Sequence, residues 1–252
     1  MLKYDNVSAF IHKKEILHEL SASFPYGTIT VILGPNGCGK STLLHCLLNH
    51  KLIHHGSILL DDRPLLSYSP KEKAKRLAFL PQLQEIPPIT VQTLVSQGRF
   101  PYTGLFGSSN YLDQKAMLKA MTDTNVLSLS ERPLTTLSGG EQKRAFLAMI
   151  LAQNTDYIIL DEPTNFLDIK HRLELLELLT YLRDQGKTII TVLHDINEAL
   201  RIADVVLLMK EGCIAKTLCK HELLDRTVIQ DIFQVQMDYV CKNDKTLTSF
   251  SL

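Results

Sequence analysis

Short apolar runs alternate with longer stretches of helical periodicity along much of this chain. The runs are rich in β-branched or aliphatic side chains, and they lie at Ile29–Leu33, Tyr157–Leu160, Thr188–Leu193 and Val205–Met209. Several of them end at glycine or acidic residues, which favour turns. Strands that alternate with helices are typical of α/β proteins, so this pattern predicts an α/β core with buried strands.

Two longer stretches carry apolar residues at helical spacing. They are Thr42–Asn49 and Ile169–Gln185, and Gly186 follows the second as a C-terminal stop. Both are expected to be helices, and each follows a loop that bears a chemical motif. The last segment, from Lys220, is expected to be short and of mixed structure.

The pattern changes between residues 87 and 136. Proline, glycine and serine cluster in GRFPYTGLFGSSN, residues 98–110, and the flanking segments Val91–Ser96 and Asp113–Thr122 have helical spacing. This change predicts an inserted helical subdomain at about residues 87–136 that extends into the helix following it. The core would then comprise residues 1–86 and 137–252.

Length and composition suit one large globular domain. The chain has 252 residues, of which 45% are hydrophobic and 21% charged, so it can bury a full core. Lysine plus arginine and aspartate plus glutamate each number 27, so the chain lacks the basic excess that attracts a nucleic acid. Composition therefore argues against a nucleic-acid partner.

Several features favour a cytoplasmic location. The apolar runs are far shorter than the roughly 20 residues that cross a bilayer, and the start, MLKYDNVSAF, lacks the apolar core of a secretory signal. The cysteines are scattered and lack the paired spacing of a zinc site. They are Cys38, Cys46, Cys213, Cys219 and Cys241. Reduced thiols are expected, in agreement with the cytoplasm.

A phosphate-binding loop follows the first apolar run. GPNGCGKST fits the pattern G-x-x-x-x-G-K-[ST] through Gly34, Gly39, Lys40 and Ser41. The loop's backbone N–H groups would curl around phosphates, Lys40 would reach the β and γ oxygens, and Ser41 would ligate Mg²⁺. A plain glycine-rich turn is the alternative, which the flanking strand and helix disfavour. The predicted site comprises Gly34, Pro35, Asn36, Gly37, Cys38, Gly39, Lys40, Ser41 and Thr42.

Two adjacent carboxylates end another apolar run, in YIILDEPT. A buried strand would deliver Asp161 and Glu162 at its carboxyl end, where open α/β sheets hold ligand-binding residues. Asp161 is expected to bind Mg²⁺ through water, and Glu162 to orient or deprotonate the attacking water in phosphoryl transfer. Taken alone, the segment could equally be a solvated turn. A phosphate loop in the same chain makes that alternative weaker.

The segment LSGGE, residues 137–141, precedes a helical stretch from Gln142 to Gln153. Ser138 and Glu141 have the spacing of a capping box, which by itself favours simple helix initiation. The two glycines between them also allow close approach of the backbone to another group, and a helix start suits a γ-phosphate. Both interpretations stay open on these residues alone.

His194 follows the apolar run that begins at Thr188, and Asp195 comes next. A lone histidine at the end of a buried strand is more often structural. Its place at a strand end beside an acidic residue makes contact with a phosphate the alternative.

Taken in order, these motifs closely resemble the ATP-binding subunits of ABC transporters. The set is GPNGCGKST, Gln82 in LPQ, LSGGE, ILDEPT, Asp168 in NFLD and His194 in VLHD, and it covers essentially the whole chain. The resemblance implies one cassette over residues 1–252. Its fold would be a P-loop NTPase core of ABC type with an inserted helical subdomain and an N-terminal antiparallel β region.

The resemblance also implies how ATP and Mg²⁺ would be bound. In a head-to-tail dimer, Gly34–Thr42 of one copy and Ser138–Glu141 of the other would enclose one ATP. Gln82 would join Mg²⁺ and sense the membrane partner, Asp168 would link the two sites, and His194 would contact the γ-phosphate. The implied catalytic residues are Glu162, His194 and Gln82; the Mg²⁺ ligands are Ser41, Gln82 and Asp161; further nucleotide contacts are Phe10, Ser138, Gly139, Gly140, Glu141 and Asp168.

Some positions near the nucleotide leave alternatives open. An aromatic residue near the N-terminus stacks on adenine in this family, and Phe10 is the nearest candidate, ahead of Tyr4. Cys38 in the phosphate loop is expected to be an inert small residue, with thiol sensitivity as the alternative.

The chain departs from the family pattern at a few positions. Glu141 stands where glutamine is commonest, and Lys143 stands where an arginine is usual, which keeps the charge. Asn165 and Phe166 stand where small residues are usual. The change at Glu141 keeps the capping pattern. Active ATP hydrolysis is expected regardless.

Within the family, the chain looks like the importers of chelated iron, cobalamin and haem, and most like ferric-citrate and siderophore cassettes. The resemblance lies in AKRLAFLPQ, TVQTLVSQGRFPY and AFLAMILAQNTDYIILDEPTNFLDIKH. The part Gly98–Tyr102 lies in the helical region that faces the permease in such importers; a turn with an exposed Arg99 is the alternative. Cargo does not touch the cassette, so a haem, cobalamin or metal-ion importer stays an alternative.

This subgroup implies specific partners. They are two transmembrane permease subunits, and indirectly an extracytoplasmic binding protein that delivers the cargo. The chain would be a peripheral protein on the cytoplasmic face of the inner membrane. ATP binding would close the dimer and hydrolysis would reopen it, through a difference in ATP affinity between the two forms.

Two other classes of function fit the sequence less well. A soluble ABC protein of translation or DNA repair typically has two cassettes, a long coiled-coil insertion or a basic face, and the sequence has none of these. A regulatory module without turnover would be expected to lose Glu162 or His194, and both are present. The transporter ATPase is therefore favoured.

Overall fold

The computed structural model describes residues 1–82, 84–104, 110–219, 226–242 and 245–251. The chain divides into two compact units, one formed by Met1–Ser67 and Ile190–Leu252 and the other by Tyr68–Ile189. Strand β8, Thr188–Val192, runs across the boundary between them. The helical subdomain expected at about residues 87–136 falls within the second unit, and its own boundaries stay a prediction.

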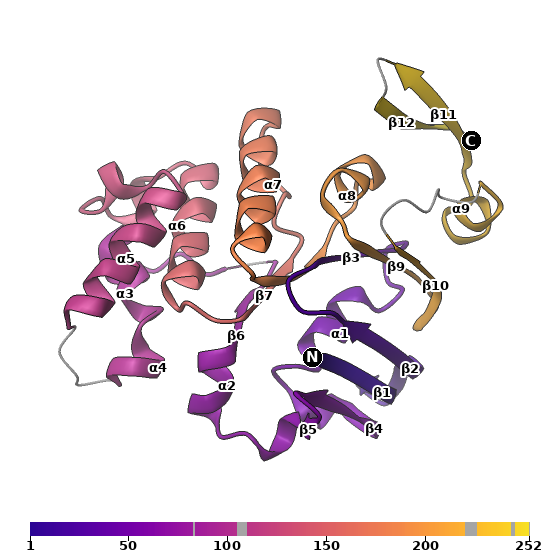
Figure 1. Cartoon of the computed structure of the whole chain (residues 1–252), viewed down its shortest axis with the longest axis horizontal. Helices are drawn as coiled ribbons and strands as arrows, with labels where there is room; N and C mark the ends of the chain where they lie inside the picture. Colours follow the sequence, from indigo (N-terminus) through magenta and orange to yellow (C-terminus); the bar gives the residue numbers. More distant parts are fainter. Residues whose placement is uncertain (83, 105–109, 220–225, 243–244, 252) are drawn as a thin grey trace. The chain divides into compact units, whose positions relative to one another are not determined.

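The first unit contains an antiparallel sheet with the strand order β2-β1-β4-β5 (Figure 1). Its strands are β1 (Leu2–Ile11), β2 (Lys14–Phe24), β4 (Ile53–Leu60) and β5 (Arg63–Pro64). His12 and Lys13 join β1 to β2 with φ of 48° and 68°, and this left-handed geometry matches the twist of the flanking strands. The N-terminal antiparallel β region is confirmed.

A second group of strands in this unit has the order β10-β9-β3. β3 (Ile29–Leu33) and β9 (Val205–Lys210) are parallel, and β10 (Cys213–Cys219) folds back antiparallel to β9. Every residue of β3 is buried, as expected for a strand covered on both faces. The strands predicted at Ile29–Leu33 and Val205–Met209 are confirmed, and so is the α/β class.

The helices of the first unit are short. They are α1 (Lys40–His45), α8 (Ile196–Ile202) and α9 (Arg226–Phe233), with the 3-10 helices η1 (His50–Leu52) and η2 (Leu65–Ser67). The α-helix expected to reach Asn49 stops at His45, because the Leu47 and Leu48 N–H groups bond to carbonyl oxygens three residues back instead of four.

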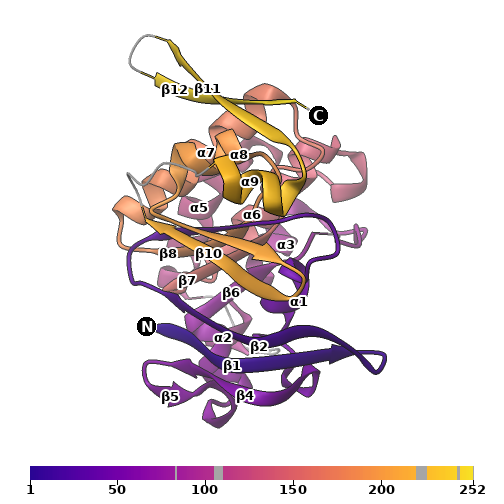
Figure 2. The ribbon, with the colours of Figure 1, turned by 90° about the vertical axis from the view of Figure 1, so that its right-hand side faces the viewer.

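The C-terminal segment is mixed, as predicted. Helix α9 leads into an antiparallel hairpin of β11 (Gln236–Lys242) and β12 (Lys245–Ser251) (Figure 2). Its first part, residues 220–225, lies outside the described residues. Asn197 of α8 ties this hairpin to the unit, because its side chain makes hydrogen bonds of 3.2, 2.9 and 2.8 Å with the backbone and hydroxyl of Thr248.

The second unit combines a parallel strand pair with longer helices (Figure 1). β6 (Leu77–Leu80) pairs with β7 (Tyr157–Asp161). The helices are α2 (Pro70–Arg76), α3 (Val91–Gln97), α4 (Phe100–Thr103), α5 (Tyr111–Asp123), α6 (Gly139–Ala152) and α7 (Ile169–Asp184), with η3 (Leu127–Leu129) and η4 (Leu134–Thr136). Gly186 follows α7 with a φ of 84°, so the predicted stop is confirmed. Among the described helices, none has the length and apolar character needed to span a membrane.

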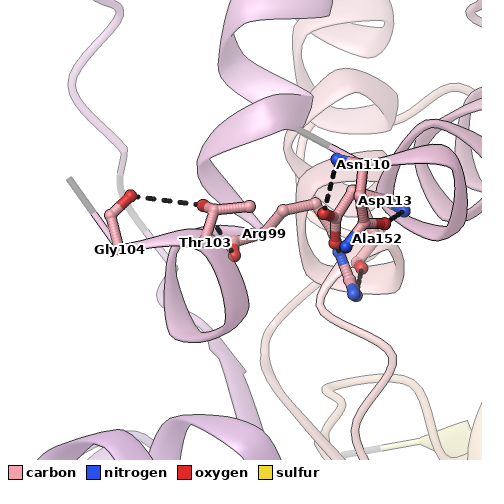
Figure 3. Close-up of polar contacts among 6 residues, drawn as sticks. All are labelled: Arg99, Thr103, Gly104, Asn110, Asp113 and Ala152. Atoms are coloured by element: carbon pink, nitrogen blue, oxygen red, sulfur yellow. Dashed lines mark hydrogen bonds and ion pairs between the residues drawn. The ribbon is translucent and has the colours of Figure 1, made fainter. Parts of the chain in front are cut away.

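The segment Gly98–Tyr102 holds the helices of this unit together. Arg99 is 7% exposed, and its Nε donates to Asp113 Oδ1 at 2.8 Å while Nη1 donates to the Ala152 carbonyl oxygen at 2.7 Å (Figure 3). Its guanidinium also lies 3.9 Å from the ring centroid of Tyr102. The alternative of a turn with an exposed arginine is therefore wrong. Residues 105–109 of the predicted loop cluster lie outside the described residues.

Asp113 serves two purposes in this cluster. It completes a capping box with Asn110 at the start of α5, and it accepts the Arg99 bond while only 1% exposed. Burial alone would raise the pKa of this carboxyl, but the Asn110 N–H and the Arg99 guanidinium outweigh burial and hold the pKa below its usual range. The ionised pair therefore stabilises the fold at neutral pH, and its contribution is lost when acid protonates Asp113.

We expect Arg99→Ala to lower the free energy of unfolding by about 3–5 kcal/mol, because Asp113 would stay buried without its cation. Urea unfolding followed by circular dichroism measures this change. The matched control is Lys119→Ala, which removes an exposed pair with Asp123 and should cost under about 0.5 kcal/mol. Equal stability of the two variants would contradict the assignment.

Candidate functional site

The predicted phosphate loop runs from the end of β3 into α1. Gly37 and Gly39 have φ of 78° and 105°, in the left-handed region that favours glycine. A Cβ at Gly34 would lie 2.4 Å from the Met209 carbonyl oxygen and 2.8 Å from Cys38 Sγ. The motif's glycines are therefore required by backbone angles at two positions and by close approach at the third.

Lys40 begins α1 and is buried. Its Nζ donates to the carbonyl oxygens of Gly34 and Pro35 at 2.7 and 3.0 Å, so the ammonium lies folded back over its own loop. An anionic phosphate oxygen would give this group a stronger, charge-assisted bond than either neutral carbonyl does. Ser41 and Thr42 follow on the first turn of the same helix.

Gly212, between β9 and β10, braces this loop. Its N–H donates to the Cys38 carbonyl oxygen at 2.9 Å, and its own carbonyl oxygen accepts the His18 N–H at 3.2 Å. Its φ is 77°, and a Cβ would lie only 2.2 Å from the Ile16 carbonyl oxygen. The sequence did not identify this glycine as part of the site. The Glu211–Gly212 pair after an apolar run indicates a turn, but it does not show that the turn contacts the phosphate loop.

The Cys38 thiol is buried in the loop. Burial raises its pKa, and the nearby Lys40 charge only partly offsets that effect. A thiol with a raised pKa is a poor nucleophile at neutral pH. The structure thus supports the expectation that Cys38 is an inert residue, over the alternative of thiol sensitivity.

The two candidate aromatic residues have different surroundings. Tyr4 is buried and donates its hydroxyl to the Leu43 carbonyl oxygen at 2.7 Å, so its ring is committed to the core. Phe10 is half-buried, and its ring centroid lies 4.5 Å from that of His54. Phe10 pairs with Glu15 on β2, and Ile16 is the next residue of that strand. A Cβ at Gly39 of the phosphate loop would contact Ile16, so this part of β2 lies beside the loop. Its contact with adenine stays a prediction.

His194 is exposed, so it is not a packed core histidine. The preceding residue, Leu193, donates its N–H to the Ile32 carbonyl oxygen of β3 at 3.3 Å. Asp195 caps α8, accepting the N–H groups of Asn197 and Glu198 at 2.7 and 3.3 Å. The acidic neighbour thus has a structural role, while contact of His194 with a phosphate stays a prediction.

In the second unit, the ends of β6 and β7 bring three predicted residues together. Because the strands are parallel, their carboxyl ends meet at one edge, where Gln82 Nε2 donates to Glu162 Oε2. Asp161 and Glu162 are 2% and 7% exposed. The alternative of a solvated turn is therefore wrong for this segment.

Lys143 contributes positive charge to the same edge. Burial lowers the pKa of its ammonium, and the negative charges of Asp161 and Glu162 act in the opposite direction. Sequence reasoning gave Lys143 no part in this site. Its position, four residues after the start of a capped helix, does not indicate which carboxylates it approaches.

The LSGGE segment forms the start of α6. Ser138 Oγ accepts the Glu141 N–H at 3.4 Å, and Glu141 Oε2 accepts the Ser138 N–H at 2.8 Å, so the predicted capping box is present. The helix begins at Gly139, three residues before the predicted start, because Ser138 is its N-cap. A Cβ at Gly139 would meet nothing within 4 Å, so this backbone is open to approach. A contact with a phosphate stays a prediction.

Asp168 caps α7. Its Oδ1 accepts the His171 N–H and its Oδ2 pairs with His171 Nδ1, both at 2.9 Å. These contacts, the backbone N–H first, hold the pKa of the exposed Asp168 carboxyl below its usual range. A cap explains the local geometry, and the link to a second site stays a prediction.

The predicted Mg²⁺ ligands offer a hydroxyl from Ser41, an amide oxygen from Gln82 and a carboxylate from Asp161. Magnesium prefers oxygen ligands of these kinds, shared with phosphates and water. Gln82 lies just after β6, and Asp161 is the last residue of the adjacent strand β7. The donor set therefore fits Mg²⁺.

We expect Gly212→Ala to lower the free energy of unfolding by about 2 kcal/mol or more, because the added Cβ combines a strained φ with a clash. It should also weaken binding of a fluorescent ATP analogue, since the displaced turn no longer holds Cys38. Gly27→Ala is the control: its φ is 64° but a Cβ meets nothing within 4 Å, so only about 1 kcal/mol is expected. Equal effects of the two variants would contradict the bracing role.

Comparisons with known proteins agree with this set of motifs. Residues 17–165 match the family described as ABC transporter. The chain is 40% identical over 227 residues to the iron(3+)-hydroxamate import ATP-binding protein FhuC of Bacillus subtilis (strain 168). The alignment covers 89% of this chain and 84% of FhuC.

Solved structures are similar over most of the chain. An ABC transporter described as of metal-chelate type, in an inward-facing conformation, has a TM-score of 0.84 and 27% identity, covering 99% of this chain and 96% of that one. The dimeric post-hydrolysis state of the ATP-binding cassette MJ0796, bound to ADP and Pi, has a TM-score of 0.76 and 26% identity, covering 88% and 100%. This chain belongs to the ABC transporter family and is one of its nucleotide-binding ATPase cassettes.

Proposed function

We propose that this chain powers import of an iron chelate, a siderophore or ferric citrate, through a membrane permease by binding and hydrolysing ATP. The observation that carries the proposal is the buried carboxylate of Glu162, held by Gln82 directly after Asp161. A phosphate loop in the same chain supplies the complementary half of an ATPase site. Buried adjacent carboxylates are costly to a fold and are typical of sites that use them.

Nucleotide binding would use the residues of the first unit. Phosphates would lie against the backbone of Gly34–Thr42, and Lys40 would exchange its two carbonyl acceptors for β and γ oxygens. Phe10 would stack on the adenine. Bound Mg²⁺ would neutralise the charge of the transferring phosphoryl group, with Ser41, Gln82 and Asp161 as its protein ligands.

Glu162 would orient the attacking water and accept its proton. The carboxylate suits this role because amide donors hold it in one orientation, and orientation is the main requirement of phosphoryl transfer. His194, exposed at the end of β8, would contact the γ-phosphate. The nearby Lys143 charge would limit the cost of the buried negative charge.

A second copy would complete each site. Ser138–Glu141 of one copy would face the nucleotide held by Gly34–Thr42 of the other, and Asp168 would link the two sites. The similarity to a dimeric cassette bound to ADP and Pi supports this arrangement. Two permease subunits would bind the dimer at the cytoplasmic face of the inner membrane, and an extracytoplasmic binding protein would deliver the cargo.

The cargo class rests on the similarity to FhuC, named for iron(3+)-hydroxamate import, and to a transporter described as of metal-chelate type. A haem, cobalamin or metal-ion importer is the alternative within the same architecture. A soluble ABC ATPase outside transport is less favoured, because the relative with 40% identity is an import protein.

We expect the purified chain to hydrolyse MgATP, and Glu162→Gln to lower kcat by about 10²-fold or more, because the amide cannot accept the proton. The variant should keep ATP affinity and accumulate as an ATP-bound dimer, measured by size-exclusion chromatography. A fully active Glu162→Gln variant would contradict the assignment of the base. A chain that is inactive even with its permease in lipid would favour a regulatory module.

The cargo is tested by uptake in cells that lack their own iron-chelate cassettes. Co-expressed with its permease, the chain should restore uptake of a ⁵⁵Fe-labelled hydroxamate siderophore or ferric citrate, and Glu162→Gln should leave uptake at background, because transport needs turnover. Labelled haem and cobalamin are measured in parallel. Uptake of one of these, without uptake of the iron chelates, would replace the cargo assignment while leaving the ATPase role intact.

A further inference from the structure

Asn165 contacts the proposed catalytic base. Its Nδ2 donates to Glu162 Oε2 at 2.5 Å. The same oxygen also accepts the amide of Gln82, which comes from the loop after β6. Two neutral donors from different segments therefore converge on one carboxylate oxygen.

The backbone between these residues is shaped to bring Asn165 back onto Glu162. Glu162 and Phe166 have φ of 51° and 65°, which non-glycine residues rarely adopt. The Asn165 N–H donates to the Glu162 carbonyl oxygen, and the Leu167 N–H to that of Thr164, both at 3.3 Å. Strain of this kind persists only where the surrounding contacts compensate for it.

Side-chain burial contributes little to holding the outer part of this loop. Phe166 is 85% exposed, whereas Leu167 is buried and anchors the far end. The Asn165 side chain, at the start of this outer part, is half-buried. Its hydrogen bond to the Glu162 carboxylate is therefore a principal contact of the strained segment, because a hydrogen bond to a charged group is stronger than one between neutral groups.

We infer that Asn165 is a positioning residue that sets the orientation of the Glu162 carboxylate toward the attacking water. The inference rests on the proposed function, in which Glu162 is the base. Gln82 is there assigned to Mg²⁺, so its amide has to serve the metal through Oε1 as well as Glu162 through Nε2. The proposed function gives Asn165 no contact with metal or nucleotide, so its donor can stay on Glu162 through the reaction.

The amide of Asn165 reaches the carboxylate of the residue three positions before it. A serine or alanine would not carry a donor of the same reach. The sequence alone marks Asn165 only as a departure from the pattern. The structure shows what its side chain contacts, the Glu162 carboxylate.

The test compares Asn165→Ala and Asn165→Asp with the wild-type chain in steady-state ATP hydrolysis and in binding of a fluorescent ATP analogue. Asn165→Ala should lower kcat about 10- to 100-fold, the equivalent of one hydrogen bond to a charged group, and leave ATP affinity unchanged. Asn165→Asp keeps the side-chain volume but places a second carboxylate beside Glu162. It should lower kcat at least as far, whereas a packing role would make it the milder change.

The control is Gln114→Ala, which removes an exposed amide on α5 and should leave kcat unchanged. Single-turnover rates in the Glu162→Gln background add a second readout: if Asn165 acts through Glu162, Asn165→Ala should slow that background no further. If Asn165→Ala unfolds the chain, the volume-conserving Asn165→Asp decides the question.

The outcomes separate this inference from the proposed function. Wild-type kcat in Asn165→Ala, or a loss of ATP affinity equal to the loss of kcat, overturns the positioning role while Glu162→Gln remains inactive. Additive losses in the double variant also overturn it. Full activity of Glu162→Gln would instead remove the proposed base, whatever the Asn165 variants do.

Discussion

Burial of short strands on both faces is the constraint on which the rest of the structure depends. β3 and β7 are buried at every position, so their backbone groups must pair with neighbouring strands, and their side chains are mostly apolar up to the strand end. Polar chemistry can begin only where such a strand ends. Gly34 follows β3, Gln82 follows β6, and Asp161 and Glu162 end β7 for this reason.

The chain handles its buried charges in two different ways. Arg99 and Asp113 form an ion pair that nothing in the proposed cycle needs to break, and they join α4, α5 and α6. Glu162 is held by neutral amides instead. A hydrogen bond from a neutral amide to a carboxylate is weaker than an ion pair, so the Gln82 contact can be exchanged when a metal or water arrives. The ion pair thus serves the fold, and the amide contacts serve the proposed reaction.

Glycine provides the other requirement, close approach of backbone to backbone. Gly34 lies against the carbonyl of Met209, and Gly212 lies against that of Ile16 while bonding to Cys38. The phosphate loop is therefore held by strands from both ends of the chain's sequence. A loop fixed by backbone contacts can present its N–H groups to a phosphate without first paying the entropy of ordering.

The sequence by itself determined the local features: the buried strands, the glycine positions of the phosphate loop, the capping box of Ser138 and Glu141, and the stop at Gly186. These follow from apolar periodicity, backbone angles and hydrogen bonds between residues a few positions apart, which a single segment contains. Tertiary structure decided the rest. Arg99 could be interpreted as an exposed turn residue because its partners lie 14 and 53 residues away. The sequence indicates only that Gly212 belongs to a turn, and the fold places it against Cys38. The sequence indicates only that Asn165 is an unusual loop residue, and left-handed backbone angles bring it onto Glu162. Contacts of these kinds depend on where distant or strained segments meet, and no local pattern encodes that meeting.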